Sequence, residues 1–203
     1  NTILNNYIGT APGRPRTLGN GDNGIYVMAP GITIGKANPD NSLDGNIIAW
    51  NARAGIYVGY GQGTSIRGNS IYRNGTMGVD LGSGGLTPND TTDGDSGPNT
   101  LLNYPIIESV TRHFSSTDIK FRILGEPNKE YTVDFYANDT LSASLFGEGK
   151  DLFAWVTVTT GPDGTGTWEH NHLYSLYKWE HVTAIATDAD GNSSEFCRAV
   201  CLE

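Results

Sequence analysis

Carboxylate and amide side chains gather most densely at residues 89–99, where the sequence reads NDTTDGDSGPN. Bringing several carboxylates together costs Coulomb repulsion unless a cation neutralises them. Ca²⁺ suits such a loop, because it accepts about six to eight oxygen ligands in flexible geometry. The spacing is not that of an EF-hand, and a solvated acidic turn explains the same residues without a metal. Calcium and a plain turn therefore stay open as alternatives, and a calcium site would use Asp80, Asp90, Asp93, Asp95 and Asn99.

Two other segments contain groups that bind metals in proteins. The segment DADGNSSE at residues 188–195 superficially resembles a calcium loop, but Gly191 comes too early for that pattern and a hairpin turn explains it. His170 and His172 would share one face of a strand. Zinc needs three or four ligands, however, and no third ligand is evident. We expect a turn in the first segment and a solvated strand end in the second.

The segment WEHNHLYSLYKWEH at residues 168–181 is unusually aromatic for a loop. Aromatic rings offer flat apolar faces with polar edges, which suits a surface that stacks against sugar rings. We expect Trp168 to lie in a core, because a buried tryptophan is common in β-sandwiches. The candidate ligand-binding residues are Tyr174, Tyr177 and Trp179.

The elements that must position these groups include an internal repeat over residues 45–81. Asn46 and Asn69 are 23 residues apart, and so are Gly55 and Gly78. A fixed period of this size marks a supersecondary unit that stacks on copies of itself. The segments are too short and too rich in glycine and asparagine to be helices. The repeat therefore predicts a solenoid of short strands.

Each complete coil of this solenoid offers three short strands with alternating apolar residues that would point inward. We expect asparagines to stack at the corners, Asn46 on Asn69 and Asn51 on Asn74, and to take the left-handed backbone that such turns need. The predicted strands are 25–27, 32–34 and 47–48, then 56–58, 65–67 and 70–71, then 79–81.

The second half of the chain has a different pattern, with longer alternating strands separated by turn residues. Tyr131, Val133 and Phe135 alternate with polar neighbours, which is typical of a half-buried strand. Seven such strands in about 100 residues fit an immunoglobulin-like sandwich. The predicted strands are 106–111, 118–124, 131–138, 152–160, 166–170, 181–188 and 195–200.

These motifs also carry a resemblance to known proteins. The run YIGT…LGNGDNGIYV…GNIIAWN…GNSIYRNGTMGVDLG resembles the parallel β-helix repeats of bacterial cell-surface and secreted proteins. NDTTDGDSGPNTLLNYPII is similar to the segment that closes such helices, and TAIATDADGNSSEF resembles the end of an immunoglobulin-like module. The resemblance implies an all-β protein with two domains. Residues 1–100 would be the last few coils of a right-handed parallel β-helix with an acidic closing loop, and residues 101–203 an immunoglobulin-like β-sandwich.

Composition excludes some classes of function. The net charge of −9 argues against a nucleic-acid partner, which needs a basic face. No apolar run reaches the roughly 20 residues of a membrane-spanning helix. Only two cysteines are present, Cys197 and Cys201, and a disulfide and two free thiols are equally compatible with their spacing.

We expect a non-catalytic region of a bacterial surface or secreted protein that provides adhesion, carbohydrate contact or a rigid stalk. No catalytic residue is assigned, because the coils from Gly45 onward contain Arg53, Arg67 and Arg73 but only Asp80 as an acid. One alternative is the accessory C-terminal part of a polysaccharide lyase or glycoside hydrolase whose active site lies on coils before Asn1. A phage or adhesin fibre is the second alternative, and the oligomeric state stays open. The fold itself hosts all these activities and does not choose among them.

Overall fold

The computed structural model describes residues 1–13, 18–37, 44–82, 84–91, 93–114, 116–141, 145–173 and 181–202. The described residues form sixteen β-strands and one short 3₁₀ segment, η1 (Pro98–Leu101), so the chain is all-β. They contain no helix with the length and apolarity that crossing a membrane would require.

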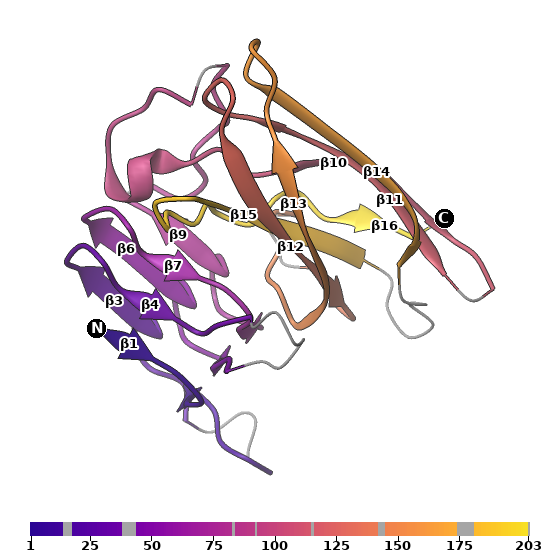
Figure 1. The fold of residues 1–203 in the computed structure, drawn as a ribbon. Helices are drawn as coiled ribbons and strands as arrows, with labels where there is room; N and C mark the ends of the chain where they lie inside the picture. The colour runs from indigo at the N-terminus through magenta and orange to yellow at the C-terminus, as the bar shows by residue number, and fades with distance from the viewer. Residues whose placement is uncertain are drawn as a thin grey trace.

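The first nine strands build three parallel sheets, and successive strands of the chain enter the three sheets in rotation. One sheet contains β1 (Thr2–Ile3), β4 (Thr33–Ile34) and β7 (Ser65–Ile66). The second contains β2 (Tyr7–Ile8), β5 (Ile47–Ala49) and β8 (Ser70–Tyr72). The third contains β3 (Ile25–Met28), β6 (Ile56–Tyr60) and β9 (Val79–Leu81). These sheets form a stack of coils, drawn in indigo to magenta in Figure 1. The predicted coil strands are thus confirmed to within one or two residues.

Aliphatic residues at equal positions of successive coils hold this stack together. Ile25 pairs with Ile56, and Ile56 with Val79, so that three aliphatic side chains lie above one another. Ile34 and Ile66 form a second such row, and all five are buried. The strands are only two to five residues long, so their stability depends on stacking the coils rather than on any one coil alone.

Asparagine rows run along the same stack. The backbone N–H and side-chain Nδ2 of Asn46 both donate to Oδ1 of Asn69, at 3.0 and 2.9 Å, and Asn51 makes the same two bonds to Asn74. The predicted stacking is confirmed. The predicted left-handed backbone of these asparagines is wrong, because none of the four has a positive φ. Before three of them the preceding residue has one instead, at Trp50 (φ 65), Gly68 (φ 67) and Arg73 (φ 57).

The remaining strands form two antiparallel sheets. One contains β10 (Ile106–Arg112), β11 (Thr117–Leu124) and β14 (Thr165–Leu173). The other has the order β13 (Asp151–Thr159), β12 (Glu130–Asn138), β15 (His181–Asp188) and β16 (Val200–Cys201). Six of the seven predicted strands are confirmed. The seventh, 195–200, is wrong, because the strand there is only Val200–Cys201, Arg198 makes an isolated bridge with Phe146, and Glu195 turns toward the coils.

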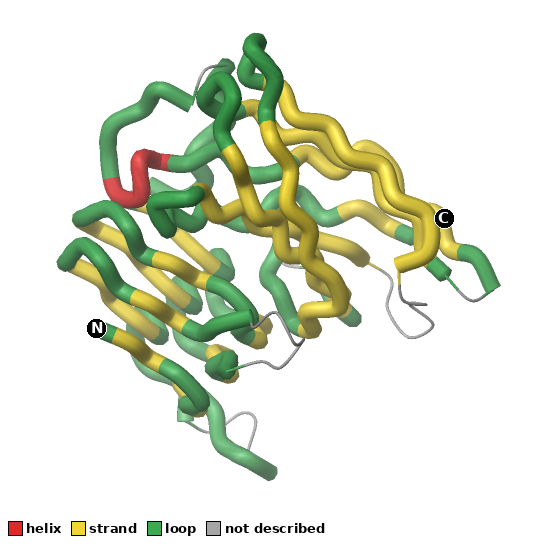
Figure 2. The backbone as a smooth tube through the Cα atoms, in the orientation of Figure 1, coloured by secondary structure: helices red, strands yellow, loops and turns green. Residues whose placement is uncertain are grey.

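The four-stranded sheet is covered on both faces. On one face, Val133 and Phe135 of β12 pack in a cluster with residues of β10, β11 and β14. On the other, Tyr136 and Ile185 join the aliphatic core of the coils, together with Phe196. Figure 2 shows the resulting succession of coil stack, four-stranded sheet and three-stranded sheet. The two halves of the chain therefore share a continuous apolar interior.

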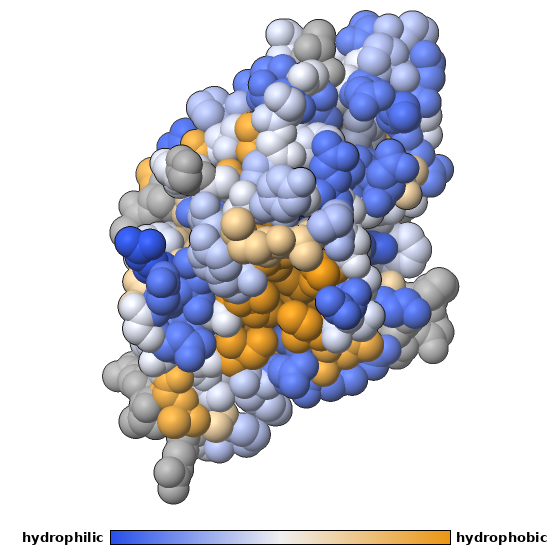
Figure 3. All heavy atoms as spheres, turned by 90° about the vertical axis from the view of Figure 1, so that its left-hand side faces the viewer, coloured by the Kyte–Doolittle hydropathy of each residue, from blue (hydrophilic) through white to orange (hydrophobic). Residues whose placement is uncertain are grey.

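The two ends of the coil stack differ. Among the described strands, β7, β8 and β9 face the antiparallel half of the chain, whereas β1, β2 and β3 pair on one side only. Figure 3 views the molecule from the side where β1 and β3 lie in Figure 1, and shows a concentrated apolar area there. Ile3 and Ile8 at this end are only partly buried. One end of the stack is covered, and the other is open.

Candidate functional site

The covered end of the stack begins where the Asn51–Asn74 row stops. Glu148, from the segment that precedes β13, places its carboxylate against the last asparagine. Oε1 of Glu148 accepts from both the backbone N–H and Nδ2 of Asn74, each at 2.9 Å, and Oε2 accepts from the N–H of Arg73. These are the two bonds that each asparagine donates to the next one in the row. The glutamate carboxylate thus substitutes for the next asparagine and ends the row with its donors satisfied.

The neighbouring sheet is closed by a second group of side chains. The N–H of Gly63 donates to Oδ1 of Asn192 at 2.6 Å, that of Thr64 to Oδ1 of Asn99 at 2.9 Å, and that of Ile66 to Oγ of Ser193 at 2.8 Å. Asn99 also donates from Nδ2 to the carbonyls of Thr64 and Ser193. Loops of the antiparallel half therefore supply partners for the free edge of β7 and the residues just before it.

Backbone atoms close the edge of β8. Ile71 and Gly149 exchange two backbone hydrogen bonds, at 2.7 and 2.9 Å, as in an antiparallel bridge. A Cβ at position 149 would lie 2.5 Å from the ring of Phe196 and 2.8 Å from that of Tyr136. The glycine is needed because any side chain would collide with both rings and separate the two backbones.

Glu195 closes the edge of β9. Oε1 accepts from the N–H of Leu81 at 3.0 Å, and Oε2 from that of Thr87 at 2.8 Å. The side chain is almost fully buried, and burial raises the pKa of its carboxyl to about 7, with the charge of Asp80 adding to the rise. We call Asn99, Glu148, Gly149, Asn192, Ser193 and Glu195 together the end cap.

A buried ion pair joins the same two parts of the chain. Nε and Nη2 of Arg67, which follows β7, donate to the two carboxylate oxygens of Asp134 at 3.0 and 2.5 Å. The Asp134 side chain is 1% exposed and that of Arg67 is 20% exposed. Burial raises the pKa of Asp134, while the bonds from Arg67 oppose the rise. The paired geometry fixes the position of the four-stranded sheet on the last coil.

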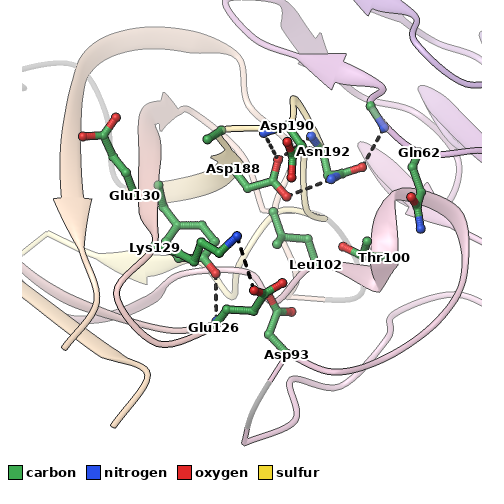
Figure 4. A pocket seen from close by; sticks show the side chains of 13 residues that line it. Gln62, Asp93, Thr100, Leu102, Glu126, Lys129, Glu130, Asp188, Asp190 and Asn192 are labelled. Carbon is green, nitrogen blue, oxygen red and sulfur yellow. Dashed lines mark hydrogen bonds and ion pairs between the residues drawn. The ribbon is translucent and has the colours of Figure 1, made fainter. Parts of the chain in front are cut away.

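A pocket of about 310 Å³ lies beside the end cap and is lined by Asp93, Glu126, Lys129 and Asp188 among others. Figure 4 shows the side chains that line it. Oδ1 of Asp93 accepts from the N–H of Asn103 at 2.8 Å, and burial, aided by nearby acidic groups, raises the pKa of this carboxyl to about 6. Lys129 lies 3.5 Å from Glu126. The pocket therefore brings Asp93 of the acidic loop near Asp188 of the later turn.

The five residues predicted to bind calcium do not form one group. Asp80 lies on β9, Asp93 lines the pocket of Figure 4, and Asp95 is exposed. Asp90 accepts from the N–H groups of Asp93 and Gly94, and the amide of Asn99 is used by the end cap. Among the described residues no three His, Cys, Asp or Glu side chains are placed to hold a metal ion. Calcium at this loop stays a prediction.

The predicted turn at residues 188–192 is confirmed. The carboxylate of Asp188 accepts from the N–H groups of Asp190 and Asn192, at 3.0 and 2.8 Å, and from Nδ2 of Asn192 at 2.8 Å. Its oxygens therefore close the turn, and the same turn presents Asn192 to the coils.

The predicted aromatic ligand-binding residues, Tyr174, Tyr177 and Trp179, lie outside the described residues. Trp168 packs on the core of the antiparallel half, with its ring 5.6 Å from that of Phe121, as expected.

Both cysteines are free thiols. Burial raises the pKa of Cys197 to about 12, and its Sγ accepts from the N–H of Ala184. Cys201 is exposed, 3.4 Å from Nδ1 of His181.

The sequence offers almost no indication of the end cap. Glu148 stands in a GEGK segment outside any repeat position, and its contact with Asn74 spans 74 residues of chain. Glu195 falls in a segment predicted to be a strand. Asn99 was predicted as a calcium ligand, and Asn192 and Ser193 fell in the segment 188–195 that was predicted to be a turn. No family model and no curated protein sequence matches the chain.

Proposed function

We propose that this protein is a non-catalytic structural region that ends a right-handed parallel β-helix. An immunoglobulin-like β-sandwich would cover the last coil. Residues 1–100 would be the coils with their closing loop and residues 101–203 the sandwich. The observation that carries this proposal is the end cap itself. All six residues of the end cap accept hydrogen bonds from N–H groups of the last coil, and together they reach all three parallel sheets.

Physical chemistry explains why such a cap is useful. The free edge of a sheet presents unpaired N–H and C=O groups that pair readily with other chains. A solenoid has three such edges at each end, and capping units are needed for solubility. The fused apolar interior, with Tyr136 and Phe196 packed on the coils, covers the core that would otherwise be exposed there.

The expected setting is a bacterial surface or secreted protein in which the capped stack serves as a rigid stalk or adhesive element. A polysaccharide lyase or glycosidase with this region as an accessory, and a phage or adhesin fibre, are the alternatives. Release of reducing or unsaturated ends from a polysaccharide panel, lost in Asp80→Asn, would favour the enzyme. A trimer in sedimentation would favour the fibre.

The decisive experiment adds positive charge where the end cap accepts N–H groups. In the double variant Glu148→Lys, Glu195→Lys, ammonium groups face N–H donors, so the sandwich should separate from the coils. In the wild type only the β1–β3 end of the stack is uncovered, so two chains that pair through it leave no further free end. In the variant both ends are uncovered, so chains can add head to tail. We expect sedimentation velocity to show wild type as monomer or dimer and the variant as longer oligomers with a lower melting temperature.

The matched control is Glu130→Lys, Glu169→Lys, which makes the same charge change at two exposed glutamates of β12 and β14. This control should sediment and melt as the wild type does. If the Glu148, Glu195 variant also behaves as wild type, the end cap does not protect the stack and the proposal is wrong.

A further inference from the structure

A row of side chains on the outer face of the third parallel sheet has no role in the end cap. Tyr26, Tyr57 and Asp80 occupy equal positions on β3, β6 and β9. The rings of Tyr26 and Tyr57 are stacked, with centroids 4.9 Å apart and planes 25° apart. This separation matches the spacing of about 4.8 Å between neighbouring strands, so the sheet itself holds one ring over the other.

The third position of the row is not filled by a ring. Asp80 is much shorter than tyrosine, so the face of Tyr57 turned away from Tyr26 borders a hollow above the carboxylate. Met77 and Leu86 line the same hollow, which belongs to a groove of about 770 Å³. The groove thus combines an aromatic ring, apolar side chains and a carboxylate in its described lining.

The carboxylate in this groove has an unused acceptor. Oδ1 of Asp80 is buried and has no hydrogen-bond partner among the described residues. Burial also raises the pKa of this carboxyl. The Asp80 side chain as a whole is partly exposed and lines the groove, so its carboxylate can accept a hydrogen bond from a ligand hydroxyl group.

We propose that this groove binds a neutral oligosaccharide, with one pyranose ring stacked on Tyr57 and a hydroxyl group donating to the carboxylate of Asp80. Sugar rings present C–H faces to aromatic rings and hydroxyl groups at their edges, which matches the arrangement of one ring face and one acceptor. This inference goes beyond the capping function and does not depend on it, since the groove lies on the side of the stack.

Charge decides between neutral and acidic sugars. The groove contains Asp80, and Arg53, the one cation among its described lining residues, lies 3.7 Å from exposed Asp22. The chain as a whole has a net charge of −9. An anionic polysaccharide would meet repulsion from this surface, whereas a neutral one would not.

Gly59 allows the stacked tyrosine rings to lie against the strand. It lies two residues after Tyr57 on the same face of β6, and a Cβ there would be 2.7 Å from the Tyr57 ring. The ring lies against the strand because no side chain stands in its way. Gly59→Ala therefore displaces the ring without removing it, and it also presses on Met28, whose Sδ would lie 2.7 Å from the added Cβ.

The two methionines of the chain allow a direct test. Met77 lines the groove, and Met28 lies on β3 outside the lining. The full chain, labelled with ¹³C at the methionine methyl groups, is titrated with maltohexaose, cellohexaose, mannohexaose and hexagalacturonate. We expect at least one neutral hexasaccharide to shift the Met77 signal and to leave Met28 nearly unchanged, and hexagalacturonate to have no effect.

Variants then assign the contacts by calorimetry. Tyr57→Ala and Asp80→Leu should weaken binding of that hexasaccharide at least tenfold, and Gly59→Ala should weaken it also. Asp80→Asn keeps an acceptor and should stay within a few-fold of wild type. Tyr7→Ala, which removes an exposed ring from a different sheet, should bind as wild type does.

Urea denaturation shows whether each variant remains folded, because Gly59→Ala contacts Met28 and would shift its signal directly. No shift of Met77 with any neutral hexasaccharide at millimolar concentration would overturn the proposal. So would preference for hexagalacturonate, or undiminished binding by a folded Tyr57→Ala variant.

Discussion

Glu148 stands beside Asn74 as the next asparagine of the row would stand. The N–H and Nδ2 of Asn74 both donate to one oxygen of Glu148 at 2.9 Å, just as those of Asn51 donate to Oδ1 of Asn74 at 3.2 and 2.9 Å. Each asparagine of the row donates to the next one, and a residue of a different type can end the row if its oxygen occupies the position of the next asparagine Oδ1. The carboxylate offers a further advantage, because its second oxygen also accepts from Arg73.

The first prediction concerns this carboxylate. Glu148→Ala removes the acceptor of the Arg73 and Asn74 N–H groups, while Nδ2 of Asn74 keeps its bond to the carbonyl of Ile48, and it should lower the free energy of unfolding by about 2–4 kcal/mol, measured by urea denaturation. Glu148→Gln keeps one acceptor for Asn74 but turns an NH₂ group toward Arg73, so its loss should be smaller, about 1–2 kcal/mol. Equal stability of Glu148→Ala and wild type would contradict the role assigned to Glu148.

The second prediction concerns the ion pair between Arg67 and Asp134. Asp134 is buried, so Arg67→Met leaves an unpaired carboxylate in the interior and should cost about 3–5 kcal/mol. The double variant Arg67→Met, Asp134→Leu removes both charges and should recover most of that loss. A double-mutant cycle measures the coupling. Additive losses in the cycle would show that the pair does not connect the two parts of the chain.

Much of the coil stack could be predicted because its information is local. Each coil repeats the same apolar and asparagine positions, and stacking fixes the register once the period is known. The confirmed pairs Asn46–Asn69 and Asn51–Asn74 follow from that period alone. The backbone angles could not be obtained in this way, because the period fixes which residues stack and not which residue of a corner takes a positive φ.

The end cap was beyond prediction because its contacts are long-range and each is made once. Glu195 reaches Leu81 across 114 residues, and Asn99 reaches Ser193 across 94. No period or spacing marks such pairs. The local pattern instead predicted a strand at residues 195–200 and a calcium ligand at Asn99. In the structure, the side-chain oxygens of Glu195 and Asn99 accept hydrogen bonds from N–H groups of the last coil.

The third prediction tests calcium at the acidic loop. A Ca²⁺ ion held by Asp93 and Asp95 should stabilise the fold, so that chelation with EGTA lowers the melting temperature and Asp93→Ala, Asp95→Ala removes this sensitivity. The measurement belongs at about pH 7.5, because the pKa of Asp93 is about 6 and the carboxyl must be charged to bind. Adding Mg²⁺ in excess of chelator is the control. An unchanged melting temperature with EGTA would contradict calcium at this site.

The fourth prediction is a pH dependence that originates at Glu195. Its pKa is about 7 in the fold and near 4.5 in the unfolded chain, because burial disfavours the charged form. Between these values the folded state holds a proton that the unfolded state has lost. Stability is therefore fully present below about pH 4.5, falls as pH rises, and levels off above about pH 7, with a slope of at most about 1.4 kcal/mol per pH unit.

Glu195→Gln isolates this effect, because glutamine does not titrate. Its NH₂ group faces one of the two N–H donors, so the variant should be less stable than wild type at pH 4.5 by about 1–3 kcal/mol. As pH rises to 7, only the wild type has a buried carboxyl that ionises, and this lowers its unfolding free energy. The difference in unfolding free energy between the two proteins should therefore narrow. Urea denaturation at several pH values measures it, and Glu130→Gln, at an exposed position, should follow wild type throughout. Parallel profiles for Glu195→Gln and wild type would show that the Glu195 carboxyl keeps an ordinary pKa. The two N–H bonds from Leu81 and Thr87 would then outweigh its burial.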